Sequence, residues 1–286
     1  MKVIYILGQG HSGSTVLSKI IGSNINIRSL GEVRHWSNAL SKKHLFIKEA
    51  DYRCSCGQAL DKCNFFSKIT NNYRTKYNLN AYLNKKGKLD LILFILGLKK
   101  VNAIKINNDD YIKFLKDIKS QISEKYIIDS SKTIGNLIKL KNTEEIDLFV
   151  IHLIRDVRGV GNSYDKIKNY NFYIEVINWI IFNYLYRKFL KNSKLNYISV
   201  SYDMFAQFPD TYLSKIGNTL NLDFSDYKEN IIKTEYHEIA GNEKYAKKLY
   251  DIKYDQTWQI ELPLFKKMFA SLIGFFFNRR WVYNKI

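Results

Sequence analysis

Glycines, hydroxyl side chains and one histidine follow the first apolar run of the chain. Val3–Leu7 leads into Gly8-Gln9-Gly10-His11-Ser12-Gly13-Ser14-Thr15, and the apolar stretch Ser14–Gly22 comes next. A strand, a glycine-rich loop and a helix in this order aim backbone N–H groups and the positive end of a helix at an anion. His11 is the only side chain of the loop that can carry charge, and a protonated imidazole donates to anionic oxygens. The loop predicts a phosphate site; the alternative is a turn that only starts a helix.

The spacing of this loop matches the nucleotide P-loop, G-x-x-x-x-G-K-[ST]. Gly8 and Gly13 occupy the glycine positions and Thr15 the hydroxyl position, but Ser14 stands where the lysine belongs. Because that lysine reaches the β- and γ-phosphates of a nucleoside triphosphate, its absence argues against ATP or GTP hydrolysis. Phosphate binding is still predicted.

A second anion site is predicted where the apolar run Leu148–Ile154 ends. The next residues are Arg155-Asp156-Val157-Arg158-Gly159-Val160-Gly161-Asn162-Ser163. Arg155 would stand at the carboxyl end of a central strand, where ligands bind in open α/β sheets. Ser163 would lie about two turns into the following helix, so a guanidinium and a hydroxyl can hold one anion. Taken alone, an Arg-Asp pair is more ordinary as a structural ion pair.

Both motifs need a parallel sheet to bring them together. Short apolar runs alternate with longer helical stretches, which indicates an α/β fold with a central parallel sheet flanked by helices. The predicted strands are Val3–Leu7, Tyr126–Ile128, Leu148–Ile154 and Tyr197–Val200; the predicted helices include Ser14–Gly22, Tyr111–Ile122, Val157–Ile167, Phe172–Leu190, Thr211–Leu220 and Leu262–Phe277. We expect one domain over residues 1–286, with a mostly helical insertion at about 34–110 that covers the acceptor side.

Together, the two motifs resemble those of the sulfotransferases that use 3′-phosphoadenosine-5′-phosphosulfate (PAPS). Gly10–Thr15 resembles their 5′-phosphosulfate loop, and Arg155–Ser163 resembles their 3′-phosphate motif. The other similar segments are Leu30-Gly31-Glu32, Asp129-Ser130-Ser131-Lys132, Val200-Ser201-Tyr202-Asp203 with Pro209 downstream, and His237-x-x-x-Gly241-Asn242 with Asp255 and Trp258 downstream. The resemblance covers most of the chain and implies the P-loop-like sulfotransferase fold of a bacterial-type member.

The resemblance also implies a role for each matching residue. Glu32 would take the proton of an acceptor hydroxyl, while His11 and Lys132 would offset charge on the leaving oxygen. We expect no metal in this reaction, and adenosine 3′,5′-bisphosphate as the product. The acceptor stays open among a carbohydrate, a glycolipid, a tyrosine and a small metabolite. The residues expected to bind PAPS are Gly10, His11, Ser12, Gly13, Ser14, Thr15, Arg155, Ser163 and Tyr202.

Three cysteines stand close together, as Cys54-Ser55-Cys56-Gly57 and Cys63. An odd number of cysteines does not make a disulfide framework. Zinc takes four ligands, and His35 or His44 are candidates for the last one, but the spacing matches no standard zinc pattern. We therefore expect reduced thiols or a redox pair, with zinc as the alternative.

The composition excludes a disordered chain, and its positive charge indicates either an anionic partner or a surface rich in solvated lysines. Hydrophobic residues make up 46% and aromatic residues 15% of the 286 residues, and the net charge is +18. No basic-aromatic motif for nucleic acid is present, so we expect none as a partner. Two other classes stay open: a P-loop-type kinase or NTPase, and a nucleotide-binding protein without catalysis.

The chain has no run of apolar residues long enough for a spanning helix and no signal-peptide pattern at its start. These features predict a cytoplasmic protein. The apolar and aromatic stretch Leu262–Trp281 is expected to pack on the core, with docking on a membrane surface or a partner as the alternative.

Overall fold

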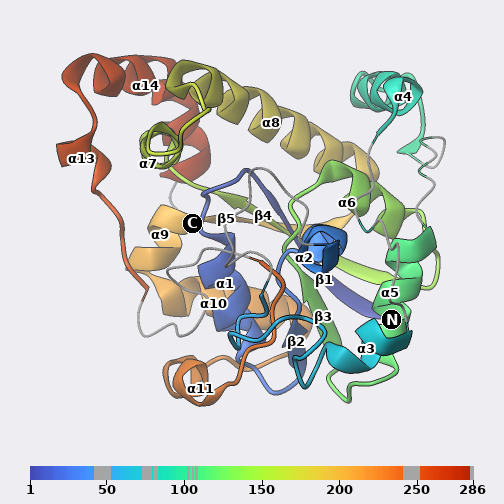
Figure 1. Ribbon diagram of the computed structural model, residues 1–286. Helices are drawn as coiled ribbons and strands as arrows, with labels where there is room; N and C mark the ends of the chain where they lie inside the picture. The colour runs from blue at the N-terminus through green and yellow to red at the C-terminus, as the bar shows by residue number, and fades with distance from the viewer. Residues whose placement is uncertain are drawn as a thin grey trace.

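Five parallel strands form one sheet at the centre of the protein (Figure 1). The computed structural model describes residues 1–41, 53–72, 79, 83–101, 104, 106, 109–240 and 252–283. The strands are β1 (Lys2–Gly8), β2 (Ile27–Ser29), β3 (Tyr126–Asp129), β4 (Asp147–Ile154) and β5 (Asn196–Ser201), in the order β2-β3-β1-β4-β5. The predicted fold class, an α/β protein with a central parallel sheet flanked by helices, is confirmed.

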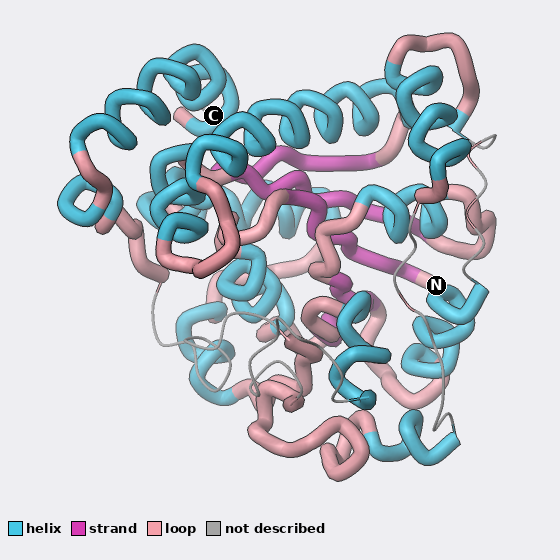
Figure 2. The backbone as a smooth tube through the Cα atoms, turned by 45° about the horizontal axis from the view of Figure 1, so that its top comes forward, coloured by secondary structure: helices cyan, strands magenta, loops and turns pink. Residues whose placement is uncertain are grey.

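Helices cover both faces of the sheet, as the tube view shows (Figure 2). Alternate side chains of β1 point to opposite faces: Val3, Tyr5 and Leu7 belong to one buried cluster, and Ile4 and Ile6 to another. The first cluster contains side chains of α5 (Asp109–Lys119), α6 (Ile134–Lys141) and α8 (Phe172–Ser193), and the second those of α1 (Ser14–Gly22), α10 (Pro209–Leu220) and α11 (Tyr227–Lys233). Because both faces are covered, the central strands β1 and β4 read as nearly continuous apolar runs.

The strand order brings the loops after β1 and β4 side by side. Gly8, the last residue of β1, pairs with Leu153 of β4, so the two strands end almost level. From β1 the chain crosses to β2 and β3 on one side of the sheet, whereas β4 and β5 lie on the other side. The crevice at such a reversal of strand order is where ligands bind in open α/β sheets.

All four predicted strands are confirmed, with ends that differ by one residue at most. β2 is missing from the prediction because it is a three-residue edge strand with Arg28 at its centre, and this pattern gives no apolar run. Helices α6, α9 (Tyr202–Gln207) and α11 were not predicted either.

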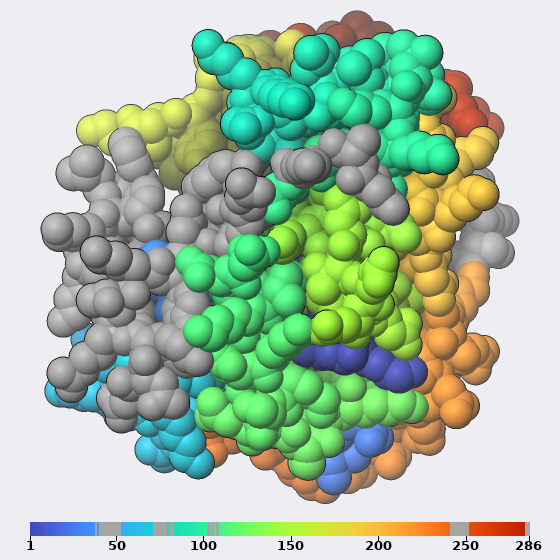
Figure 3. Space-filling model, turned by 90° about the vertical axis from the view of Figure 1, so that its right-hand side faces the viewer, coloured from blue at the N-terminus to red at the C-terminus, as the bar shows by residue number. Residues whose placement is uncertain are grey.

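The described residues between 34 and 110 contain helices, turns and isolated bridges but no strand. They comprise the end of a 3₁₀ turn (Val33–His35), α2 (Trp36–Ser41), α3 (Ser67–Asn72), α4 (Lys85–Ile95) and the start of α5. α4 lies near one end of α8 (Figure 1) and forms the upper part of the face drawn in Figure 3. The interpretation of this stretch as an insertion over the acceptor side stays a prediction.

α14 (Leu264–Phe277) packs on the core through both small and aromatic residues. Ala270 and Gly274 are buried, and a Cβ at Gly274 would lie 2.4 Å from the Val157 side chain of α7 (Val157–Asp165). Phe269 and Phe277 are partly buried and pack against the cluster that contains Ala270. The exposed apolar side chains of α14 are Leu264, Phe265, Met268, Leu272, Ile273, Phe275 and Phe276. Among the described helices, none combines the length and the apolar character needed to cross a bilayer.

A buried ion pair links α1 to the segment before residue 240. The side chain of Lys19 is fully buried, and its Nζ lies 3.5 Å from Glu238 Oε2 and 4.1 Å from the centre of the Tyr236 ring. Ser18 donates to Glu238 Oε1 over 3.3 Å, and Ser29 donates to the same oxygen. A carboxylate held in this way is stable only while its cation and donors are present.

Lys19→Met should therefore lower the free energy of unfolding by about 3–5 kcal/mol, because it leaves the buried Glu238 carboxylate without its cation. Urea unfolding followed by circular dichroism measures this change. The matched control is Lys233→Met, which breaks the exposed pair with Glu229 (3.0 Å) and should change stability by less than about 1 kcal/mol. If both variants lowered the free energy of unfolding by the same amount, the burial of the Lys19–Glu238 pair would not be the reason for its importance.

Candidate anion-binding site

The loop after β1 and the start of α1 form an uncapped helix N-terminus. Gly13 is the N-cap residue, its φ of 88° lies in the left-handed region, and no side chain caps the helix. The first N–H groups of a helix have no partner within the helix, and the helix dipole adds positive potential there. The start of α1 therefore has the features of an anion site, and the binding of a phosphate there stays a prediction.

Two tyrosines press against the glycines of this loop. A Cβ at Gly10 would lie 2.5 Å from the Tyr164 hydroxyl, and a Cβ at Gly13 would lie 2.2 Å from the Tyr202 ring. Any side chain at either position would displace these rings. Glycine is therefore required in this loop for two reasons: the turn itself, and the close packing of side chains from α7 and from the start of α9.

The cation that the loop itself lacks comes from the end of β3. Lys132 Nζ donates to Ser14 Oγ over 3.1 Å and forms a close ion pair with Glu32. The backbone of Lys132 is left-handed, with φ of 65°, and the turn before it is held by Asp129 Oδ1, which accepts from the Ser131 N–H over 2.7 Å. Ser14 stands in the lysine position of the motif, so the ammonium of Lys132 reaches the region that the missing lysine would serve.

Glu32 lies in a strongly cationic surrounding. Arg34 donates to Glu32 Oε2 over 2.9 Å, and His35 Nε2 lies 3.5 Å from the same oxygen. Burial acts to raise the pKa of Glu32, but Lys132, His35 and Arg34 outweigh it and hold the pKa well below its usual range. Burial lowers the pKa of Lys132, against the effect of Glu32. At neutral pH Glu32 is an ion-paired carboxylate, which can accept a proton only weakly while Lys132 stays in place.

Backbone pairing on both sides fixes the segment that carries Glu32. Gly31 O accepts from the Ser130 N–H over 2.9 Å, and the Glu32 N–H donates to Ile239 O over 2.7 Å. The Ile239 N–H returns a bond to Leu30 O over 2.8 Å. The end of β3 and the segment around Ile239 therefore set where the Glu32 carboxylate lies.

His11 is held in the loop as a neutral imidazole. Its backbone is left-handed, with φ of 61°, and its ring meets the Tyr164 ring edge to face at 4.6 Å. Burial, with added repulsion from Lys132 and Arg155, lowers the pKa of His11 to about 4. At pH 7 the ring can donate one N–H bond but carries no charge, so the positive charge beside the loop comes from other side chains, such as Lys132 and Arg155.

Arg155 joins the two predicted motifs. Its guanidinium donates to the His11 carbonyl over 2.9 Å and to Asp255 Oδ2 over 2.8 Å. The Arg155 carbonyl accepts from the Trp179 indole N–H over 3.0 Å, which ties the end of β4 to α8. Its Nε is buried and has no hydrogen-bond partner among the residues that the structure describes. A buried donor left in this way is suited to an anion.

The aspartate of the Arg-Asp pair serves the fold. Asp156 caps α7 by accepting from the Arg158 N–H over 2.7 Å and pairs with the Arg158 side chain. It also accepts from Asn278 over 3.1 Å and from the Tyr283 hydroxyl over 2.6 Å. Asp203 Oδ2 in turn accepts from the Asp156 N–H over 2.7 Å. The alternative of a structural ion pair therefore describes Asp156, while Arg155 turns toward the loop.

The other two predicted donor-binding residues lie nearby. Tyr202 lies between the loop and Arg155: its ring adjoins Gly13, and the Arg155 guanidinium carbon lies 5.5 Å from the ring centre. Ser163 Oγ donates to the Gly159 carbonyl over 3.0 Å, one turn earlier in α7, and Gly159 itself faces the Arg155 side chain. The predicted residues thus gather around the ends of β1, β3, β4 and β5, and their roles toward a ligand stay predictions.

Some residues of the site carried no functional prediction of their own. Asp255 was noted only as part of a downstream motif, and its contact with Arg155 depends on two segments 100 residues apart. Arg34 and Tyr164 have no local signal that marks them. Gly241 and Asn242 lie outside the described residues.

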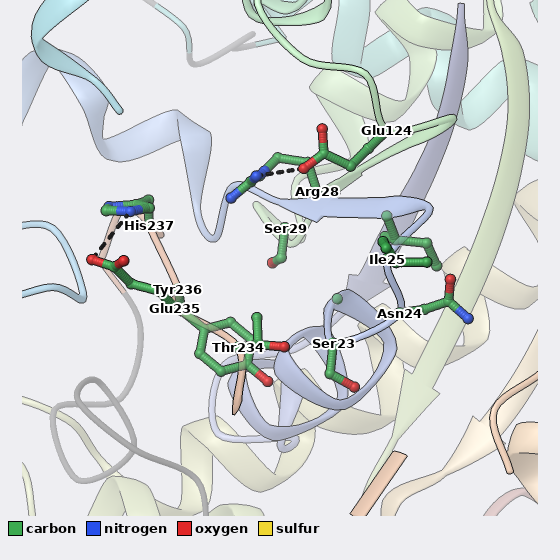
Figure 4. Close-up of a pocket in the computed structure, with 12 residues that line it drawn as sticks. Ser23, Asn24, Ile25, Arg28, Ser29, Glu124, Thr234, Glu235, Tyr236 and His237 are labelled. Carbon is green, nitrogen blue, oxygen red and sulfur yellow. Dashed lines mark hydrogen bonds and ion pairs between the residues drawn. The ribbon is translucent and has the colours of Figure 1, made fainter. Parts of the chain in front are cut away.

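A separate pocket of about 240 Å³ opens at the other end of the sheet (Figure 4). It is lined by residues at the end of α1, around β2 and before β3, and by residues 234–237. None of the predicted site residues lines it, because they follow the strands rather than precede them.

Comparison with solved structures bears on the fold. The chain aligns over 97% of its length with 94% of the sulfotransferase domain from the Synechococcus PCC 7002 olefin synthase, with a TM-score of 0.54 and 18% sequence identity. The chain has a sulfotransferase-like fold. The sulfotransferase domain from the curacin biosynthetic pathway matches with a TM-score of 0.49 and 16% identity, over 97% of both chains. Neither a protein-family model nor a curated protein sequence matches the chain.

The depressed pKa of His11 predicts an acid-dependent loss of stability. With a pKa near 4 in the folded protein against an ordinary value of 6.5, the unfolded chain binds a proton in this window that the native protein does not. The contribution of His11 to stability therefore falls as pH drops from about 6.5 to 4. Asparagine tolerates a left-handed backbone, so His11→Asn should keep the loop and remove this dependence.

Thermal unfolding at pH 7 and pH 5 tests this expectation. The melting temperature of His11→Asn minus that of the wild type should be more positive at pH 5 than at pH 7. Other groups with shifted pKa values, His152, Asp129 and Asp203, are present in both proteins and cancel in the difference. A difference that does not vary with pH would contradict the neutral, buried state of His11.

Proposed function

We propose that the protein is a PAPS-dependent sulfotransferase that transfers a sulfuryl group to an acceptor hydroxyl. The observation that carries this proposal is the bond from Arg155 to the His11 carbonyl at 2.9 Å. Arg155, the predicted 3′-phosphate residue, thus contacts the predicted 5′-phosphate loop, and this contact supports a single nucleotide with two phosphates as the ligand. The sulfotransferase-like fold supports the same conclusion.

The described residues offer what such a nucleotide needs. The uncapped N-terminus of α1 would hold the 5′ end, and the unpartnered Arg155 Nε with the Ser163 hydroxyl would hold the 3′-phosphate. When bound, PAPS supplies an activated sulfuryl group whose leaving group is a phosphate. Lys132, already beside Ser14, would place its positive charge where negative charge grows on that leaving group.

Glu32 would serve as the base on the acceptor side. The Lys132 ammonium contacts both the Glu32 carboxylate and the Ser14 hydroxyl. A ligand that draws this ammonium toward the loop would weaken the ion pair, and Glu32 would then be a stronger base. The acceptor is proposed only as a hydroxyl compound, with a carbohydrate, a glycolipid, a tyrosine or a small metabolite as the candidates.

Titration calorimetry with adenosine 3′,5′-bisphosphate tests the donor site. The wild type should bind this ligand without metal and more tightly than Mg·ATP. Arg155→Ala should weaken binding by about 2–4 kcal/mol, because a desolvated phosphate loses a charged partner. Adenosine 5′-phosphate, which lacks the 3′ group, should lose much less affinity in the same variant.

A milder pair of variants separates ligand contact from folding. Ser163→Ala should cost about 1 kcal/mol of binding, as for one neutral hydrogen bond. Thr219→Ala is the matched control, since Thr219 also bonds the carbonyl four residues earlier (3.0 Å) but lies in α10.

Unchanged affinity in Arg155→Ala, or tighter binding of Mg·ATP, would overturn the proposal in favour of another nucleotide class.

Turnover with radiolabelled PAPS and a panel of acceptors tests the chemistry. Glu32→Gln should lower turnover by about 10²–10⁴-fold with nearly unchanged nucleotide affinity, because the amide can still accept hydrogen bonds from Lys132 and Arg34 but cannot take a proton. Lys132→Met should lower turnover by about 10²–10³-fold through loss of charge stabilisation. Lys139→Met, which loses an ion pair with the exposed Asp109, is the control. Joint loss of binding and turnover in Glu32→Gln would make Glu32 a structural anchor, and binding without turnover on any acceptor would indicate a nucleotide-binding protein without catalysis.

A further inference from the structure

Four side chains that can bind a metal meet outside the anion site. Cys54, Cys56, Cys63 and His237 each present one ligand atom, and all four atoms lie within 4.8 Å of one another. We call this group the Cys3His cluster. Its members come from the turns after residue 53 and from a segment 174 residues further along the chain than Cys63.

Two of the distances in the cluster are close to those around one tetrahedral ion. The imidazole Nδ1 of His237 lies 3.2 Å from Cys63 Sγ and 3.7 Å from Cys54 Sγ. Around zinc, with Zn–S near 2.3 Å and Zn–N near 2.0 Å, neighbouring ligand atoms stand about 3.5–3.8 Å apart. Cys54 and Cys63 are buried, and Cys56 and His237 are partly exposed, which leaves a path by which an ion can enter.

Backbone donors surround the three sulfurs of the cluster. Cys54 accepts a hydrogen bond from the backbone of Cys56, and Cys56 accepts one from the backbone of Gln58. Cys63 accepts from the backbone of Phe65 and Phe66. These bonds fix where the sulfur atoms lie around the centre of the cluster.

The second nitrogen of the histidine faces a carboxylate. His237 Nε2 lies 3.6 Å from Glu235 Oε1, as the dashed line in Figure 4 shows. A metal-bound histidine commonly directs its other ring nitrogen to a carboxylate, which orients the ring and raises its basicity. Of the two histidines that the sequence suggested as a fourth ligand, His35 instead lies beside Glu32, and His44 is outside the described residues.

We propose that the Cys3His cluster binds one zinc ion. Three cysteine sulfurs and one imidazole nitrogen within reach of one ion suit zinc. A site with four protein ligands is closed to substrate and therefore structural. The proposal does not depend on sulfuryl transfer, because none of the four side chains belongs to the anion site.

The ion would fasten two segments on which Glu32 depends. The Ser55 N–H donates to Glu238 O over 3.0 Å, and Ser55 Oγ donates to Tyr236 O over 2.7 Å. Ile239 bridges Cys54 on one side and Gly31 on the other, next to Glu32. Zinc at His237 would thus hold the strip of backbone that positions the candidate base.

Metal analysis of the full chain, purified without a histidine tag, tests the proposal. Plasma mass spectrometry for zinc, iron and copper should find one zinc per chain. Ellman's reagent should leave the three thiols unreactive in native protein and detect all three after a zinc chelator is added. Replacement of the zinc by cobalt should give the intense visible absorption of tetrahedral Co²⁺ with thiolate ligands.

His237→Gln should lose most of the zinc, and His35→Gln is the matched control that should retain it. If His237→Gln does not fold, the thiol protection and the cobalt spectrum of the wild type still decide. A metal-free wild type with reactive thiols after growth in zinc-supplemented medium would overturn the proposal. Three other results would also overturn it: iron or copper in place of zinc, a disulfide among the cysteines, or full zinc content in His237→Gln.

Discussion

The ammonium of Lys132 lies between Ser14 and the carboxylate of Glu32, and most of the site is arranged around that contact. Three features bring these groups together. They are the left-handed turn at Lys132, the Asp129–Ser131 bonds before it, and the backbone pairing of Gly31 and Glu32. A buried carboxylate and a buried ammonium are each costly alone, so each keeps the other charged. In the proposed reaction, the same sharing would link the binding of an anion at the loop to the basicity of Glu32.

The strand order makes this possible, because β1 lies between β3 and β4. The loop after β1 therefore receives Lys132 from one neighbouring strand and Arg155 from the other. Arg155 is the second shared group, since it bonds the His11 carbonyl, Asp255 and the face of Tyr202 at once. With a neutral His11, these two cations bring positive charge to the loop.

The segment from Tyr236 to Ile239 connects the anion site to the rest of the protein. On one side it carries the buried Glu238 that pairs with Lys19 of α1, and on the other it carries His237 of the Cys3His cluster. Its last residue, Ile239, bonds the backbone on both sides of Gly31. Fold stability, the proposed zinc ion and the position of Glu32 thus depend on four consecutive residues.

Local patterns in the sequence were enough to predict the four longer strands, the glycine-rich loop and the Arg155 motif. The conformation of a run of apolar residues or glycines is set largely by residues close to it in the sequence. The edge strand β2 is too short and too polar for such a pattern. The pairing of Lys132 with Glu32, the neutral state of His11 and the approach of His237 to three cysteines were decided by the tertiary structure. Each depends on burial or on contact between segments 100 or more residues apart. The spacing of residues along the chain does not determine how close such segments come in space.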